Sequence, residues 1–188
     1  MSDPRPEVLD FLLTRRSRPA KTLTTPVPTH EELAPILLAA ARTPDHGKLE
    51  PWRFIVLEGA ALQRLAADVT VRGPQLGVEG DKLEKARRQF ADAGLAVAVI
   101  SSPVVSPKVP EIEQVLSAGA VCLAMLNAAL ASGWGANWLT GWMATDRTFL
   151  KRSLSLSKPE FVAGFIHIGT ERIAPPERPR PDVSSITK

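Results

Sequence analysis

Apolar residues recur along the chain at two different spacings, and together these predict interleaved helices and strands. Spacings of three and four residues predict helices at 7–16, 33–41, 60–71, 81–91 and 111–132. Continuous apolar or β-rich runs predict strands at 52–57, 95–100, 136–140 and 161–168. Elements in this order indicate an α+β or α/β sandwich with a mixed sheet inside.

Several predicted helices carry recognisable end signals. Thr29 and Glu32 form a capping-box pair in front of the second helix, although Pro35 lies deeper in that helix than is ideal. Gly133 supplies a stop for the longest helix. Asp146 is placed to cap a short helix that follows it.

The longest predicted helix, 111–132, carries a broad face of small apolar residues. Its members are Val115, Ala118, Val121, Cys122, Met125, Ala128, Ala129 and Ser132. Such a face suits close packing, either against the same helix of a second subunit or within one subunit, and the pattern leaves both open. Cys122, the one cysteine, is expected to be a small core residue in a reducing compartment.

Length and composition fit a single domain over residues 1–188. The chain is 44% apolar and 23% charged, and a chain of this size buries roughly 70% of its unfolded surface. Residues 174–188 are expected to form an extended tail, rich in Pro and Arg in its first half. With no signal-type segment and no window of about twenty apolar residues, a cytoplasmic protein with no membrane partner is expected.

The net charge of +3 does not indicate a nucleic-acid partner, because basic and acidic residues are interleaved. Metal-dependent hydrolysis is also disfavoured, since His30, His46 and His167 lack ligand-type spacing.

Candidate chemistry begins at the end of the first helix with Arg15, Arg16 and Ser17. Two guanidinium groups and a hydroxyl can bind a phosphate through charged hydrogen bonds of about 1.5–3 kcal/mol each. Arginines at a helix C-terminus are also favoured by the helix dipole, which is the more common explanation when taken alone.

The segment 44–52 makes phosphate binding the better explanation for the two arginines. It reads Pro-Asp-His-Gly-Lys-Leu-Glu-Pro-Trp between a helix and a strand. It resembles the loop Pro-Ser-Ser-x-Asn-x-Gln-Pro-Trp of the flavin-dependent nitroreductase family, with the same ends and spacing but a different middle. The Pro-Asp-His form, after an Arg-Arg-Ser helix end, is similar to the smaller members of the YdjA-like type. The long helix, the turn 133–138 and the last strand follow in the family's order.

The resemblance implies a three-layer α+β sandwich with a mixed, mostly antiparallel sheet, in a homodimer whose subunits exchange segments. It also implies one FMN at each subunit interface. Arg15, Arg16 and Ser17 match the segment at the phosphate and ribityl part of FMN, and Arg180 matches a late phosphate-binding arginine. The first helix and the tail are expected to wrap across the partner.

Other positions match residues that contact the flavin ring. Arg42 and His46 match positions that reach the flavin from the other subunit, and Lys48 stands where the commoner loop has its ring-contacting asparagine. A further match is with the strand along the ring: Trp138, Leu139 and Thr140. A cation near N1 and O2 of reduced flavin would favour hydride acceptance.

The implied reaction is a two-step exchange. NADH or NADPH delivers hydride to the flavin and leaves, and a nitroaromatic, quinone or similar small acceptor then occupies the same face. This scheme needs no dedicated dinucleotide fold, and the sequence has no G-x-G-x-x-G after a strand.

Two alternatives remain at this stage. The first keeps the fold and FMN but performs another reaction, such as dehalogenation, flavin breakdown or oxidation of a biosynthetic intermediate. The second is a non-enzymatic module in which the arginines bind nucleic acid or a phosphorylated ligand.

Overall fold

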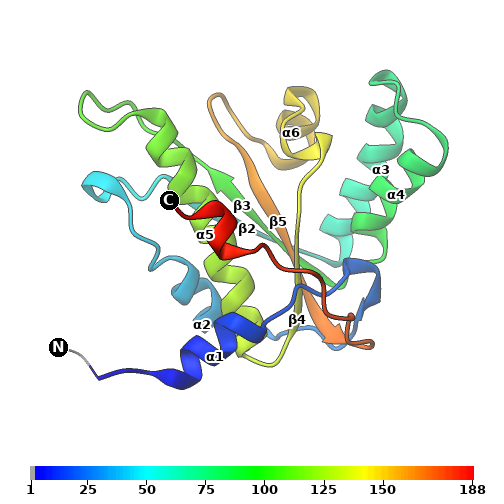
Figure 1. The fold of residues 1–188 in the computed structure, drawn as a ribbon. Helices are drawn as coiled ribbons and strands as arrows, with labels where there is room; N and C mark the ends of the chain where they lie inside the picture. The colour runs from blue at the N-terminus through cyan, green and yellow to red at the C-terminus, as the bar shows by residue number, and fades with distance from the viewer. Residues whose placement is uncertain (1–2) are drawn as a thin grey trace.

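A five-stranded sheet forms the middle layer of the computed structural model, which describes residues 3–188 (Figure 1). Its strands are β1 (Leu23–Thr24), β2 (Trp52–Glu58), β3 (Leu95–Ser101), β4 (Gly135–Leu139) and β5 (Phe161–Glu171). β5 pairs with β3 along one edge and with β4 and β1 in succession along the other, and β2 pairs with β3. Each of these pairings is antiparallel.

Helices cover both faces of this sheet. The α-helices of the described chain are α1 (Pro6–Thr14), α2 (His30–Ala40), α3 (Gly59–Gln75), α4 (Gly80–Ala91), α5 (Glu111–Ala131), α6 (Arg147–Leu154) and α7 (Val183–Ile186). Figure 1 shows α3, α4 and α6 on one side and α2 and α5 on the other. The predicted three-layer α+β sandwich is therefore confirmed.

β3 joins the two layers of core because all of its residues are buried. Ala96, Ala98 and Ile100 pack into the cluster with α3, α4 and α6, while Val97 and Val99 pack into the cluster with α2 and α5. This alternation follows from the two-residue repeat of a strand. It explains why the segment is apolar throughout.

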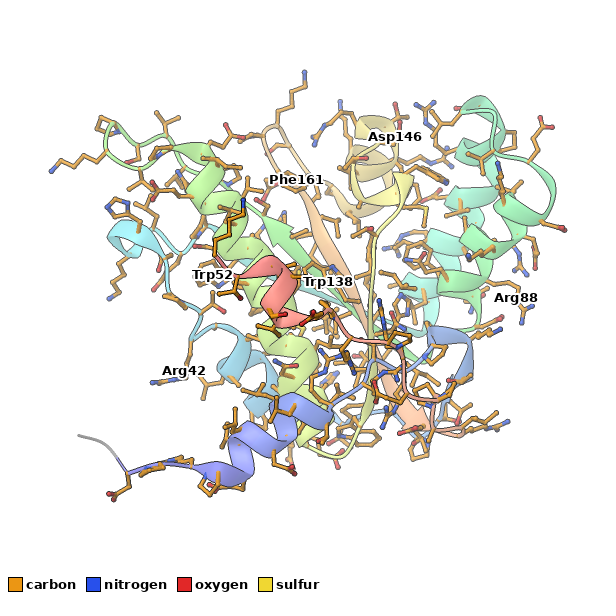
Figure 2. All side chains as sticks on the ribbon, viewed as in Figure 1. Arg42, Trp52, Arg88, Trp138, Asp146 and Phe161 are labelled. Atoms are coloured by element: carbon orange, nitrogen blue, oxygen red, sulfur yellow. The ribbon has the colours of Figure 1, made fainter. Side chains whose placement is uncertain are left out.

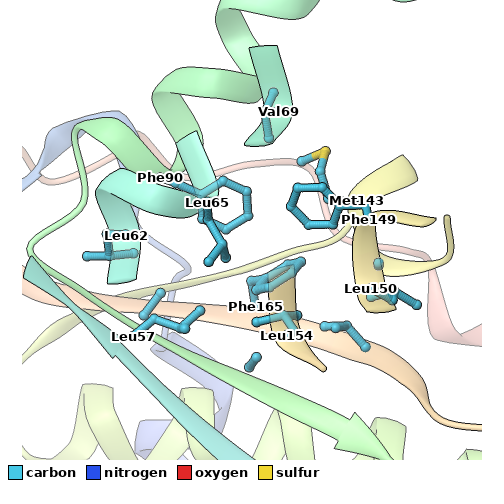
Figure 3. Packing of buried hydrophobic residues seen from close by; sticks show 14 of the residues in the cluster. Leu57, Leu62, Leu65, Val69, Phe90, Met143, Phe149, Leu150, Leu154 and Phe165 are labelled. Carbon is cyan, nitrogen blue, oxygen red and sulfur yellow. The ribbon is translucent and has the colours of Figure 1, made fainter. Parts of the chain in front are cut away.

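Three buried phenylalanines pack among aliphatic residues in the core on the α3, α4 and α6 side (Figure 3). Phe90 meets Phe165 edge to face at a ring-centroid distance of 5.1 Å, and it stacks with Phe149 at 6.5 Å. Burying each of these side chains contributes about 1.5–3 kcal/mol. They hold α4 and α6 against β5.

All the longer predicted elements are present, with shifted ends. α1 ends at Thr14, two residues earlier than predicted, while α3 runs to Gln75, beyond the predicted end. Thr140 lies outside β4. The tail is not extended throughout, since Asp182 accepts a hydrogen bond from the Ser184 N–H and caps α7. The two-residue strand β1 has no counterpart in the prediction.

The small-residue face of α5 is buried within its own subunit, against the sheet. Ala118, Val121, Cys122 and Met125 belong to the core beside β3 and β5. The suggestion that this face packs against a second copy is therefore wrong. The opposite face remains in solvent, where Ile112, Leu116 and Leu123 are 61%, 66% and 45% exposed.

The sequence does contain one apolar stretch of about the length of a membrane span, in α5, contrary to the prediction. By length and composition it is the one helix, among the described residues, apolar enough to cross a membrane. In this fold its inner face packs on the sheet instead.

Candidate functional site

The segment after α1 is fixed to the edge of the sheet. α1 ends because Arg15 has extended backbone angles, φ −56° and ψ 142°. Three residues later the Arg18 N–H donates to the Ala136 carbonyl at 2.8 Å, and the Asn137 side-chain amide donates to the Arg18 carbonyl. These bonds hold the Arg-Arg-Ser segment beside β4.

Arg15 is half-buried and incompletely bonded. Its Nη2 donates to the Ser17 hydroxyl at 3.2 Å, while its buried Nε has no hydrogen-bond partner. Burial lowers the pKa of Arg15, and the positive charges of Arg180, Arg16 and Arg18 lower it further. A guanidinium group in these surroundings favours an anion, because an anion offsets both the repulsion and the lost hydration.

The C-terminal tail brings Arg180 to this cluster. Arg16 donates to the Pro176 carbonyl and pairs with the Glu177 carboxylate at 3.3 Å. Arg180 pairs with the same carboxylate at 2.9 Å. The structure thus places Arg15, Arg16, Ser17 and Arg180 in one cluster, here called the arginine clamp.

Arg18 is a member of this region that sequence reasoning missed. Its Nε pairs with Glu171 at 2.6 Å, and both residues line a cavity of about 610 Å³ with Trp134 and Arg172. Its position directly after Ser17 is the feature of the sequence that could have identified Arg18. Its partner lies in β5 and could not be identified from spacing.

The loop 44–50 lies against the N-terminal end of α5. His46 Nδ1 lies 2.8 Å from the Glu113 carboxylate, and the Ser117 hydroxyl donates to the Pro44 carbonyl at 3.2 Å. Gly47 has φ +76° and Lys48 has φ +54°, so the loop turns sharply here. His46 and Lys48 are both exposed on this turn.

One chain does not bring the arginine clamp and the loop together. Arg42 is exposed beyond the end of α2, at the left of Figure 2, close in sequence to the loop. The loop contacts the start of α5, whereas the clamp is tied to Ala136, just beyond the other end of that helix. The 21 residues of α5 span roughly 30 Å. The loop and the clamp of one chain therefore lie near opposite ends of α5.

Trp138 lies against Gly164 of the neighbouring strand β5. Its Nε1 donates to the Ala163 carbonyl at 3.2 Å, and a Cβ added to Gly164 would stand 2.1 Å from that nitrogen. Gly164 therefore makes room for the indole, which is 36% exposed. Leu139 is half-buried, Thr140 is exposed, and Gly141 turns the chain with φ +111°.

This three-layer arrangement is shared with solved structures. The nitroreductase-like family protein from Bacillus cereus superposes with a TM-score of 0.80 at 19% identity, covering 100% of this chain and 97% of that one. A nitroreductase from Desulfovibrio desulfuricans, solved in complex with FMN, superposes with a TM-score of 0.74 at 22% identity, covering 100% and 98%. These likenesses show the nitroreductase-like fold.

The sequence comparisons go further. Residues 12–170 match the model of the Nitroreductase family, so the chain belongs to this family. It is 34% identical over 167 residues to YdjA of Escherichia coli strain K12, which is named as a candidate NAD(P)H nitroreductase. That match covers 89% of this chain and 90% of YdjA. The resemblance inferred from the loop and the Arg-Arg-Ser segment is confirmed.

Proposed function

We propose that this chain is an FMN-dependent NAD(P)H oxidoreductase that reduces nitroaromatic, quinone or similar small acceptors by two successive hydride transfers. The observation that carries the proposal is the half-buried Arg15, whose Nε lacks a partner inside a cluster of like charges. A phosphate monoester satisfies this group in both charge and geometry.

The residues of the arginine clamp fit the phosphate end of FMN. Arg15 and Ser17 are linked to each other by a hydrogen bond, and Arg16 and Arg180 present two further guanidinium groups. Each charged hydrogen bond to phosphate contributes about 1.5–3 kcal/mol. FMN, when bound, supplies the flavin N5 that accepts and donates hydride.

The ring end of the site needs residues from a second chain under this proposal. Arg42, His46 and Lys48 lie near the far end of α5 from the clamp of their own subunit. A two-fold symmetric pair of chains places the loop of one subunit beside the clamp of the other. The Glu113 carboxylate then holds His46 in place, and Lys48 contributes positive charge near the reduced ring.

Exposed apolar side chains support a homodimer. α1 has no buried residue, and its Leu9 and Leu13 are 59% and 71% exposed. Leu116 on the outer face of α5 is 66% exposed. Apolar side chains left exposed on these two helices would be covered by a second copy of the chain. We therefore assign the interface to α1 and the outer face of α5.

The strand end 138–140 completes the proposed site. Trp138, Leu139 and Thr140 lie where β4 leaves the sheet, and we place them along the flavin ring. The open face of the ring would admit NADH or NADPH first and the acceptor afterwards. One shared face accounts for a chain without a separate dinucleotide-binding motif.

Two measurements test this function. The absorption spectrum of the purified protein, with identification of the cofactor released by heat, tests for FMN. Steady-state oxidation of NADH and NADPH with a nitroaromatic and a quinone then separates this reaction from dehalogenation or flavin breakdown. A monomer that takes up no FMN from an excess of the cofactor would contradict the proposal.

A further inference from the structure

Glu177 is bound at the arginine clamp by two of the residues that the phosphate of FMN would use, Arg16 and Arg180. Its Oε1 accepts from Arg180 at 2.9 Å and lies 3.3 Å from Arg16 Nη1. The same oxygen accepts from the Arg178 N–H at 3.0 Å. A backbone N–H and two guanidinium groups around one carboxylate oxygen form the arrangement expected for a bound anion.

The tail is attached to the body of the protein through this clamp. Within the described range 3–188, every polar contact between residues 174–188 and the rest of the chain is made by Arg16, to the Pro176 carbonyl and the Glu177 carboxylate. Residues 174–182 carry no regular secondary structure before α7. Release of Arg16 therefore removes the polar attachment of the tail.

We propose that Glu177 is an internal competitor of the FMN phosphate: in the free protein its carboxylate pairs with Arg16 and Arg180 of the clamp, and it leaves these two guanidinium groups when the phosphate binds. This inference rests on the proposed function, because it takes the phosphate of FMN as the arriving anion.

The exchange is favourable for two physical reasons. A phosphate monoester carries about −1.5 to −2 charges at neutral pH and three acceptor oxygens, against one charge and two oxygens on a carboxylate. The Glu177 side chain is also 65% exposed, so its ion pairs belong to the weak, solvent-screened kind. Phosphate can therefore displace it, while the carboxylate still lowers the apparent affinity for FMN.

The arrangement also keeps the clamp assembled before FMN arrives. Arg15 lies among the positive charges of Arg16, Arg18 and Arg180. A carboxylate between Arg16 and Arg180 offsets part of their repulsion. The tail can thus hold Arg180 near the clamp in the free protein, where it is available to the phosphate.

The test compares FMN with riboflavin, which has the same ring but no phosphate. Cofactor-free wild type and Glu177→Gln are titrated with each, following the quenching of flavin fluorescence. We expect Glu177→Gln to bind FMN about two- to fivefold more tightly, the range set by exposed ion pairs, and riboflavin with unchanged affinity. Glu84→Gln removes the same charge from an exposed pair on α4 and should change neither.

A second arm uses inorganic phosphate alone. Its stabilisation of the cofactor-free protein, measured as the rise in Tm with phosphate concentration, should be larger for Glu177→Gln than for wild type. A Glu177→Ala variant should repeat both results.

The outcomes separate the two proposals. Unchanged or weaker FMN binding by Glu177→Gln would overturn the competitor role, and weaker binding would make Glu177 a residue that positions the arginines. If wild type binds neither FMN nor riboflavin, the proposed function fails, and the phosphate arm still decides whether Glu177 competes for the clamp.

Discussion

Arg15 illustrates how one residue can matter for ligand binding more than for folding. Its guanidinium bonds only to Ser17, and its Nε is unpaired. We expect Arg15→Ala to weaken FMN binding by about 1.5–3 kcal/mol, or roughly 10- to 150-fold, while leaving Tm nearly unchanged. Flavin occupancy after gel filtration measures the loss of FMN. Arg64→Ala, at an exposed position of α3, is the control and should keep its flavin. Full occupancy in Arg15→Ala would count against the clamp.

His167 is a residue whose burial predicts a pH dependence of stability. It is 2% exposed in β5, its Nε2 has no partner, and burial lowers its pKa to about 4. The unfolded chain takes up a proton near pH 6.5 and the folded chain does not. The contribution of His167 to the free energy of unfolding is therefore complete above pH 6.5. It decreases as the pH falls from 6.5 to 4, by up to about 3 kcal/mol.

Denaturant unfolding between pH 7 and pH 4 measures this loss. Carboxylates paired with arginines, such as Asp146 with Arg72, have lowered pKa values and lose stability in the same direction, mostly at lower pH. A His167→Gln variant isolates the histidine contribution and should show a shallower slope between pH 6.5 and pH 4. An identical slope in both proteins would exclude His167 as the cause.

The sequence identified the basic residues of the arginine clamp but not the acidic residue that pairs with them. The fold brings Arg15, Arg16, Ser17 and Arg180 together, and their binding of FMN stays a prediction. Their acidic partner Glu177 was not identified, because an isolated glutamate in a Pro-rich tail has no spacing that indicates an ion pair 161 positions from Arg16.

Single elements were predictable where local chemistry determined them. The Thr29–Glu32 capping box forms as expected, with the Thr29 N–H donating to Glu32 at 2.8 Å. β1 could not be predicted, because two residues form a strand only through pairing with Thr170 and Glu171 of β5. Periodicity likewise predicted the apolar face of α5 but not what packs against it. A sheet of the same chain and a helix of a second chain both require small apolar residues on that face.

The outer face of α5 supports a prediction about assembly. Leu116 is 66% exposed and makes little contribution to the core of its own subunit. For the proposed interface we expect Leu116→Asp to convert a dimer into a folded monomer, because charges buried between two subunits are strongly unfavourable. Light scattering after gel filtration measures the mass. Leu76→Asp, an exposed position at the end of α3, is the matched control and should stay dimeric.

At the scale of the whole molecule, the layered fold was predictable because its order of helices and strands resembled one family over nearly the whole chain. The match of residues 12–170 to the Nitroreductase family confirms that inference. The site was less accessible to sequence reasoning. The loop and the clamp lie near opposite ends of α5, and spacing along the chain does not reveal whether one proposed centre takes them from one subunit or from two.

The length of α5 has one more consequence for a symmetric pair of chains. Each polypeptide would donate its clamp to one active centre and its loop to the other. Mixing Arg15→Ala chains with chains altered at Arg42, His46 and Lys48 should therefore yield hybrids in which one centre carries every lesion and the other carries none. Recovery of up to half the flavin content in such hybrids, from two parents that each hold almost none, would show trans-complementation; no recovery would mean that each polypeptide builds its centre alone.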